Sequence, residues 1–197
     1  MTCFHRRLRS ERGFTIVELL VTMTVMAIVL TVFAQVLITT SNTSSRVEEQ
    51  SSLQNEVRAT VDRLTTDFRQ ATNTNGTTPV ESLSGTTVTF DSPDRTTPFH
   101  LRRIAYQLVG GSLQRSVTTS TDTDGWPWLW PATPGPWIEQ VGSVTNATPF
   151  VFLDANGVVT SDPNAVRSVR ISLTVAPRQT QGGSSSYTAL VSIRTLQ

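Results

Sequence analysis

The stretch Arg12-Gly13-Phe14-Thr15-Ile16-Val17-Glu18-Leu19-Leu20 decides the organisation of this 197-residue chain, because it opens a long apolar run around one carboxylate. From Phe14 to Ile38, 25 residues, the only strongly polar side chains are Glu18 and Gln35. A helix that rises about 1.5 Å per residue needs about 20 residues to cross a bilayer. The run predicts a membrane-spanning helix that carries a soluble head. A carboxylate near one end of such a helix indicates a functional site.

The basic residues around the apolar run predict its orientation. Arg6, Arg7, Arg9 and Arg12 precede the run, and Arg46 is the first basic residue after it. Positive charge stays on the cytoplasmic side of a membrane, so we expect a single pass through the plasma (inner) membrane with the head outside. The run is too long for a secretory signal peptide and no small-residue cleavage site follows it.

The basic leader followed by Gly13, Phe14 and Glu18 resembles the N-terminus shared by type IV prepilins and type II secretion pseudopilins. The resemblance implies that a prepilin peptidase cuts between Gly13 and Phe14 and methylates the amine of Phe14. It also implies an extracellular or periplasmic filament, with other major and minor pilins or pseudopilins, membrane lipid and an inner-membrane assembly platform as partners. An ordinary signal anchor is the alternative, but it gives no reason to place Glu18 in the first membrane-facing turn.

The expected role of Glu18 is assembly and registry. After cleavage the amine of Phe14 is positive at neutral pH and the carboxylate of Glu18 is negative. The resemblance implies that Glu18 of an incoming subunit meets the N-terminus of its neighbour. Such a pair is strong at low dielectric, and either charge left alone is penalised. The alternative is that Glu18 only extends toward the lipid headgroups.

The chain divides into four expected segments: a leader peptide over 1–13, a transmembrane and assembly half of the helix over 14–38, an amphipathic half over 39–72, and a β-rich head over 73–197. Thr39 to Ser45 is rich in poor helix formers and is expected to be a hinge or a locally melted turn. Beyond it, apolar residues recur at helical spacing and predict a helix face that lies against a sheet. The stripe consists of Leu53, Val57, Val61, Leu64, Phe68 and Ala71, and most charged neighbours, Asp67 among them, are placed off it.

The head has the alternation of β-strands, which gives an α+β, pilin-like fold of one long helix on an antiparallel sheet. The Gly110-Gly111 pair predicts a hairpin turn, Asn156-Gly157 predicts a type I′ turn, and Asn73 to Gly76 is expected to end the helix. The strands are expected at Thr86–Phe90, Ile104–Leu108, Leu113–Val117, Phe150–Leu153, Val169–Val175 and Tyr187–Ile193.

Two segments carry a narrower resemblance to J-type minor pseudopilins. Leu64 to Ala71 is similar to the end of their helix, which often has leucine, an acid, a basic residue, glutamine and alanine. Tyr106-Gln107-Leu108 with Gly111-Ser112-Leu113-Gln114-Arg115 is similar to their hairpin pattern of tyrosine, leucine, glycine, leucine and arginine. The resemblance implies a minor, filament-initiating subunit rather than a bulk pilin.

Composition excludes several other classes of function. The net charge is +1, so nothing in the balance calls for nucleic acid, and the single cysteine, Cys3, lies in the leader. No nucleophile, phosphate-binding or catalytic motif appears, so we expect neither an enzyme nor a cofactor. Arg102, Arg103 and Arg115 could form a small basic patch, but a solvated strand face is the preferred interpretation.

Asp154-Ala155-Asn156-Gly157 resembles the opening of a calcium loop. The position that needs the closing glutamate is Ala165, so the signal fails. We therefore expect a plain turn without a metal. The alternative is a weak calcium site formed by Asp154 and Asp162.

All four tryptophans fall within twelve positions of a proline-rich segment. This segment either covers one end of the sheet or presents a contact surface for a partner subunit, because tryptophan is enriched at interface hot spots. The residues concerned are Trp126, Trp128, Trp130 and Trp137.

The sequence therefore predicts a minor pilin or pseudopilin in a type IV pilus or a type II secretion pseudopilus. Two alternatives stay open. One is a tip pilin that binds a ligand in DNA uptake or adhesion, and the other is a membrane-anchored exported domain that is not assembled.

Overall fold

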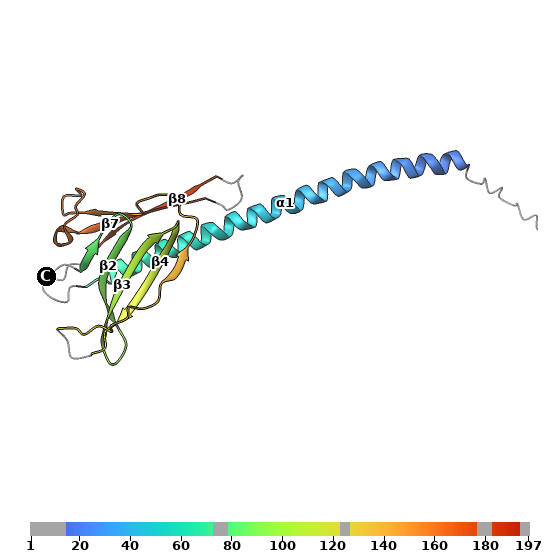
Figure 1. The fold of residues 1–197 in the computed structure, drawn as a ribbon. Coiled ribbons are helices and arrows are strands. Elements are labelled where there is room, and N and C mark those ends of the chain that lie inside the picture. The colour runs from blue at the N-terminus through green and yellow to red at the C-terminus, as the bar shows by residue number, and fades with distance from the viewer. Residues whose placement is uncertain (1–14, 73–78, 123–126, 177–182, 194–197) are drawn as a thin grey trace, which may run out of the picture. The chain divides into compact units, whose positions relative to one another are not determined.

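The computed structural model describes residues 15–72, 79–122, 127–176 and 183–193. Its long helix is α1 (Ile16–Arg69), and a short 3₁₀ helix, η1, covers Pro163–Ala165. The strands are β1 (Val80–Leu83), β2 (Thr87–Asp94), β3 (His100–Val109), β4 (Ser112–Thr119), β5 (Ile138–Val141), β6 (Phe150–Leu153), β7 (Ser168–Val175) and β8 (Ser185–Ser192). The order of helix and strands can be followed in Figure 1. The chain divides into two compact units, residues 1–45 and 46–197.

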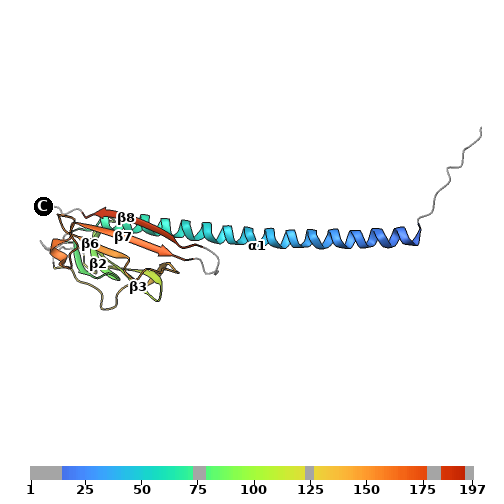
Figure 2. The same cartoon turned by 90° about the horizontal axis from the view of Figure 1, so that it is seen from above.

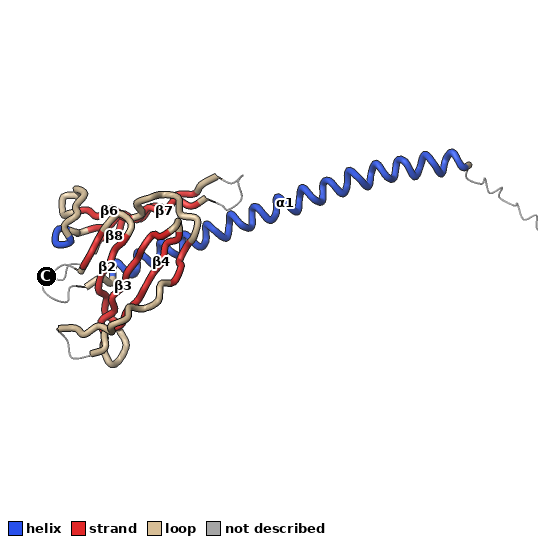
Figure 3. The backbone as a smooth tube through the Cα atoms, in the orientation of Figure 1, coloured by secondary structure: helices blue, strands red, loops and turns tan. Residues whose placement is uncertain are grey.

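The first unit contains the apolar half of α1. Its threonine hydroxyls donate to backbone carbonyls three or four residues earlier, which satisfies the polar groups of the side chains within the helix itself. Thr39 and Thr43 bond in this way to Gln35 and Thr39, and Ser45 bonds to Ser41. The expected locally melted turn at Thr39–Ser45 is therefore wrong, and Figure 3 shows α1 as one continuous helix. The local hydroxyl bonds explain why these poor helix formers are accommodated.

The second unit begins with the amphipathic half of α1. The predicted stripe is confirmed: its members from Val57 to Ala71 are buried, and Leu53 is half-buried. Thr60 and Asp67 are buried as well, so the buried face is wider than the stripe. The helix ends at Arg69, before the expected stop at Asn73–Gly76, which lies outside the described residues.

Sheet A is an antiparallel meander of β1 to β5 in chain order. The predicted hairpin between β3 and β4 is confirmed, with Val109 opposite Ser112. Gly110 and Gly111 both have positive φ, which glycine adopts without steric cost. The short strands β1 and β5 complete the edges, and sequence analysis missed both.

Sheet B consists of β6, β7 and β8 in that order, and Figure 2 shows these three strands side by side. The predicted strands are confirmed, but the type I′ turn at Asn156-Gly157 is wrong, because that turn needs positive φ at both residues. Only Gly157 has it. The carboxylate of Asp154 accepts the amides of Asn156 and Val158, both at 2.8 Å, and this side-chain cap replaces the expected geometry.

A chain of aromatic rings joins the helix to both sheets. Phe68 of α1 stacks on Phe90 of β2 with ring centroids 4.6 Å apart, and it meets Phe150 of β6 edge-on at 6.5 Å. Phe90 in turn lies 6.4 Å from Tyr106 of β3, and Phe150 lies 6.5 Å from Phe152. One hydrophobic core thus serves the helix and both sheets, which confirms the α+β, pilin-like fold.

Candidate assembly segment and the head surface

The N-terminal turn of α1 is held by Thr15. Its hydroxyl oxygen accepts the amide of Glu18 at 3.3 Å, and its carbonyl accepts the amide of Leu19 at 3.1 Å. Thr15 is therefore an N-cap residue, and Glu18 stands three positions later in the first turn. The Glu18 side chain is exposed. The expected cleavage and methylation residues, Gly13 and Phe14, lie outside the described residues, as does the leader over 1–13.

The apolar half of α1 presents its side chains outward on every side. From Ile16 to Ile38, the exposed fraction of each large apolar side chain lies between 52% (Leu19) and 80% (Ile16). By length and composition this helix could cross a membrane, and none of its apolar window is buried in the described chain. Contiguous exposed apolar surface of this extent indicates a membrane or another protein as its environment.

The tryptophan segment folds over the outer face of sheet A, the face that points away from the core. Gly135 accepts a hydrogen bond from the Ser116 hydroxyl at 2.7 Å, and its amide donates to the Thr118 hydroxyl at 2.9 Å. Ser116 and Thr118 are buried although their strand face points away from the core. The segment also packs through Trp130, whose ring lies 4.1 Å below the guanidinium of Arg103.

The remaining tryptophans are placed differently. Trp128 is half-buried, and its ring lies 5.7 Å from that of Phe99. Trp137 is 45% exposed and the neighbouring Leu129 is 61% exposed, while Trp126 lies outside the described residues. The segment thus covers part of the sheet and leaves apolar side chains at the surface.

The three arginines on β3 and β4 form neither a common patch nor a solvated face, so both interpretations of them are wrong. Alternation along the strands places Arg103 on the outer face of sheet A, where it pairs with Glu81 and Asp91. Arg102 and Arg115 lie on the core face. Arg102 donates to the carbonyl of Pro93 at 3.2 Å, and Arg115 pairs with a carboxylate of the helix.

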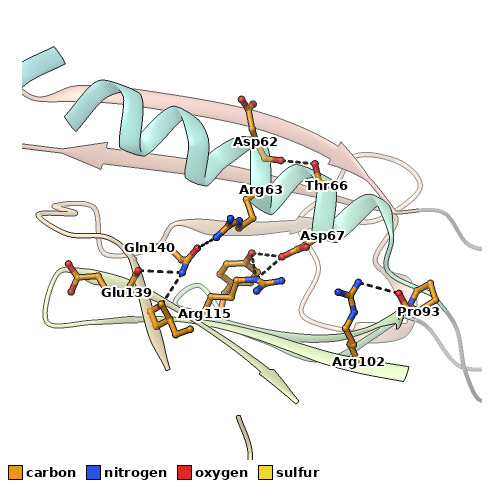
Figure 4. Close-up of polar contacts among 11 residues, drawn as sticks. Asp62, Arg63, Thr66, Asp67, Pro93, Arg102, Arg115, Glu139 and Gln140 are labelled. Atoms are coloured by element: carbon orange, nitrogen blue, oxygen red, sulfur yellow. Dashed lines mark hydrogen bonds and ion pairs between the residues drawn. The ribbon is translucent and has the colours of Figure 1, made fainter. Parts of the chain in front are cut away.

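That carboxylate is Asp67, which is only 7% exposed and forms a buried polar cluster with Tyr106 and Arg115 (Figure 4). The Tyr106 hydroxyl donates to Asp67 Oδ2 at 2.6 Å, and Arg115 Nε donates to the same oxygen at 2.9 Å. Tyr106 and Arg115 are directly opposite each other on β3 and β4. Burial, and then the neighbouring Asp67, raise the pKa of Tyr106 far above its usual value, so the phenol stays protonated. The proximity of Tyr106 and Asp67 raises the pKa of Arg115 against the opposing effect of burial.

Sequence analysis placed Asp67 off the buried stripe and missed this cluster. A signal existed, because Asp67 lies three residues after Leu64 and four before Ala71, both buried, and side chains at these spacings share a helix face. Its acidic character argued for solvent, since Asp is rarely buried without a partner. The partners come from strands 39 and 48 residues further along the chain.

The two aspartates considered for a metal are both engaged with backbone amides. Asp154 caps its own turn, and Asp162 accepts the amide of Asn164 at 2.9 Å as the N-cap of η1. Within the part of the chain that the structure describes, no group of three or more metal-ligating side chains is present.

A long helix that is apolar in its first half and amphipathic in its second, with a core shared between helix and antiparallel sheets, is a pilin-like fold. Comparison with known proteins agrees. Residues 8–34 match the family model of the prokaryotic N-terminal methylation motif. The chain is also similar to the pilin-like protein PilA3 of Thermus thermophilus, with 29% identity over 58% of this chain and 57% of the relative.

These findings support the type IV pilin family for this chain. The motif, together with the apolar helix, supports membrane anchoring. The match spans just over half the length of the relative, and the narrower resemblance to J-type minor pseudopilins stays a prediction.

Proposed function

We propose that this chain is a minor pilin or pseudopilin of a type IV pilus or a type II secretion pseudopilus, placed in the complex that initiates the filament. Prepilin peptidase cuts between Gly13 and Phe14 and methylates the new amine. Before assembly the subunit resides in the plasma (inner) membrane with its head outside. An inner-membrane assembly platform then extracts it, and the segment from Phe14 to Ile38 packs against the helices of other subunits.

The observation that carries this proposal is the exposure of the apolar half of α1 together with one acid at its start. Side chains from Ile16 to Ile38 contact no core within the described chain, so their burial must come from outside it. Lipid covers such a segment before assembly, and other helices of the same kind cover it afterwards. A permanent anchor needs only the first of these environments and has no use for Glu18.

Glu18 supplies the registry in this proposal. In the membrane its carboxylate lies one turn into an apolar helix, where an unpaired charge is costly. In a filament, the amine of a neighbour's Phe14 offers a counter-charge at low dielectric, so the pair forms only in a subunit seated at the correct height. The exposed Glu18 side chain is compatible with a partner outside its own helix.

The initiating role is supported by the residues that carry the J-type resemblance. Asp67, Tyr106 and Arg115 belong to its two separate motifs, and they meet in one hydrogen-bonded cluster. In this chain the two motifs are therefore joined by side chains that bond to one another.

The head also needs contacts of its own with neighbouring minor pilins. We place them at the tryptophan segment, where Trp137 and Leu129 are exposed on a support fixed by the Gly135 hydrogen bonds. A Trp137→Ala variant is expected to weaken pairing with another minor pilin at least several-fold while the head keeps its unfolding midpoint, since truncated interface anchors commonly cost about 2 kcal/mol or more. Unchanged pairing in a pull-down between the two heads would remove this role.

The test of the assembly proposal is a pair of substitutions on one helix. Glu18→Ala is expected to leave membrane insertion intact and to reduce incorporation into filaments on the order of tenfold or more, because the neighbour's amine is left buried without a counter-charge. Glu56→Ala, an exposed acid in the head half, is the matched control and should assemble normally. Quantitative blotting of sheared filaments against the membrane fraction measures both. Normal incorporation of Glu18→Ala would contradict the proposal.

A further inference from the structure

The buried cluster of Asp67, Tyr106 and Arg115 joins the helix to two neighbouring strands of sheet A. We propose that this cluster sets the register of α1 on sheet A: it selects one seating of the helix over seatings displaced by a helical turn. The inference concerns the head alone and holds whether or not the subunit enters a filament.

The apolar part of the interface defines the register poorly. Its helix residues repeat every three or four positions, so a shift of four residues puts Leu53, Val57 and Leu64 where Val57, Val61 and Phe68 lie, while Thr60 takes the place of Leu64. Hydrophobic contact has no direction and depends mainly on the area removed from water. A helix displaced by one turn, about 5.4 Å, would therefore still bury apolar side chains against the sheet.

The polar cluster, in contrast, can form in only one of these positions of the helix on the sheet. Among the buried residues of α1, Asp67 is the one that carries a charge. A displacement by one turn would either bring Arg63, four residues before Asp67, to its place or move the end of α1 past it, since the helix ends at Arg69. Arg63 would set a like charge against Arg115, and the displaced helix end would leave Arg115 and the Tyr106 hydroxyl without an acceptor. A charge that loses its partner in such a site is penalised, so both displaced positions of the helix are disfavoured.

The distances within the cluster also restrict the position of the helix on the sheet. Asp67 Oδ2 receives both donors, and Arg115 Nε also lies 3.1 Å from the Tyr106 hydroxyl oxygen, so the three groups close on one another. Strands β3 and β4 hold the two donors as a cross-strand pair, so their spacing is fixed by the sheet and not by the helix. The register in turn decides which charged side chains of the helix face away from the sheet.

A buried ion pair commonly adds little net stability compared with apolar residues of similar size. The triple variant Asp67→Leu, Tyr106→Phe, Arg115→Leu should therefore keep a cooperative unfolding transition but lose its single register. Phe at position 106 keeps the ring that stacks near Phe90. A second variant, Arg63→Asp with Asp67→Ala, moves the acid by one turn and should favour a displaced seating.

The experiment measures a distance in the full-length chain, purified in detergent, by electron paramagnetic resonance between two spin labels. With Cys3, the single native cysteine, replaced by Ser, labels are attached at Glu56→Cys on α1 and Val109→Cys at the end of β3, two exposed positions of the head. The parent chain should give one narrow distribution, and both variants should show a second population displaced by about 5 Å. Arg63→Gln, which breaks only the exposed bond from Arg63 to Gln140, is the control and should match the parent.

Two results would overturn the inference. One is a single, unchanged distance distribution in the folded triple variant, because the register would then be set without the cluster. The other is a triple variant that shows no cooperative unfolding, because the cluster would then supply stability and not the choice of register.

Discussion

The two halves of α1 belong to one helix, but their apolar side chains differ in exposure. From Ile16 to Ile38 every large apolar side chain is exposed, whereas in the head half the stripe from Val57 to Phe68 is buried against two sheets. The first half has no polar cluster to orient it, and its hydroxyls bond within the helix. The second half carries Asp67, which is bonded to sheet A.

This difference separates two kinds of burial. The head half finds its partners within the chain: apolar contacts with both sheets bury it, and Asp67 is the buried charge that we propose sets its register. The apolar half must find its partners elsewhere, in lipid or in other subunits, and a uniform apolar surface suits both. A helix that moves from lipid into a filament needs no specific contacts along the way. In the proposed filament, Glu18 supplies the specific contact that fixes the helix at one height.

Removing a phenylalanine side chain from each half should have very different effects on the free energy of unfolding. Phe68→Ala should lower the free energy of unfolding of the head by about 3–5 kcal/mol, because it leaves a cavity at the centre of the aromatic chain. Phe33→Ala, in the exposed half, should change it by less than about 0.5 kcal/mol. Urea unfolding of both variants in detergent, followed by circular dichroism, measures the difference. Equal losses would mean that the apolar half contributes to the stability of the head.

A second substitution tests whether the tryptophan segment belongs to the packed head. A Cβ atom at Gly135 would lie 1.9 Å from the carbonyl oxygen of Val117, so Gly135→Ala forces the segment off the sheet. We expect a loss of about 1–3 kcal/mol and a red shift in tryptophan fluorescence. Gly183→Ala meets nothing within 4 Å and is the matched control. An unshifted spectrum for Gly135→Ala would show that the segment is not held there.

The pH dependence of the head tests the buried cluster. Because burial and Asp67 raise the pKa of Tyr106, the folded chain keeps a proton that the unfolded chain loses near pH 10. This contribution to stability is complete below about pH 10 and declines above it, by at most about 1.4 kcal/mol per pH unit. Thermal unfolding between pH 8 and 11 should show the decline in the parent and in Tyr187→Phe. Tyr106→Phe should lack it, and a decline of equal slope there would place its origin elsewhere.

The smallest effect is expected where the two units meet in the sequence. Thr43→Ala replaces a poor helix former whose hydroxyl bonds to Thr39 within the helix. Alanine favours the helix by a few tenths of a kcal/mol, roughly, so helicity in detergent should rise slightly. The unfolding midpoint of the head should not move. A lower midpoint in a thermal scan would show that Thr43 supports the head as well.

Much of this molecule follows from local patterns in its sequence. The apolar run, the helical stripe, the Gly110-Gly111 hairpin and the alternating strands each depend on neighbours within a few residues, and the structure confirms them. Asp67 could not be placed in this way, because its burial depends on Tyr106 and Arg115, which the fold brings from distant strands.

The other misses have either distant or local physical causes. The strands β1 and β5 are short edges whose pairing depends on β2 and β4 already being in place. The turn at Asn156-Gly157 takes its form from the Asp154 carboxylate, which accepts the amides of Asn156 and Val158. The carboxylate partners of Arg103 and Arg115 lie on other elements, so local sequence gave no sign that these two arginines are paired.

We infer that the apolar half of α1 is an assembly segment whose mature N-terminus, Phe14, is created by processing. Mass spectrometry of the N-terminal peptide of the protein isolated from its own membranes tests it most directly. The account predicts a chain that begins at Phe14 and carries one methyl group on its amine. A chain that still begins at Met1, in cells that process their other prepilins, would contradict it.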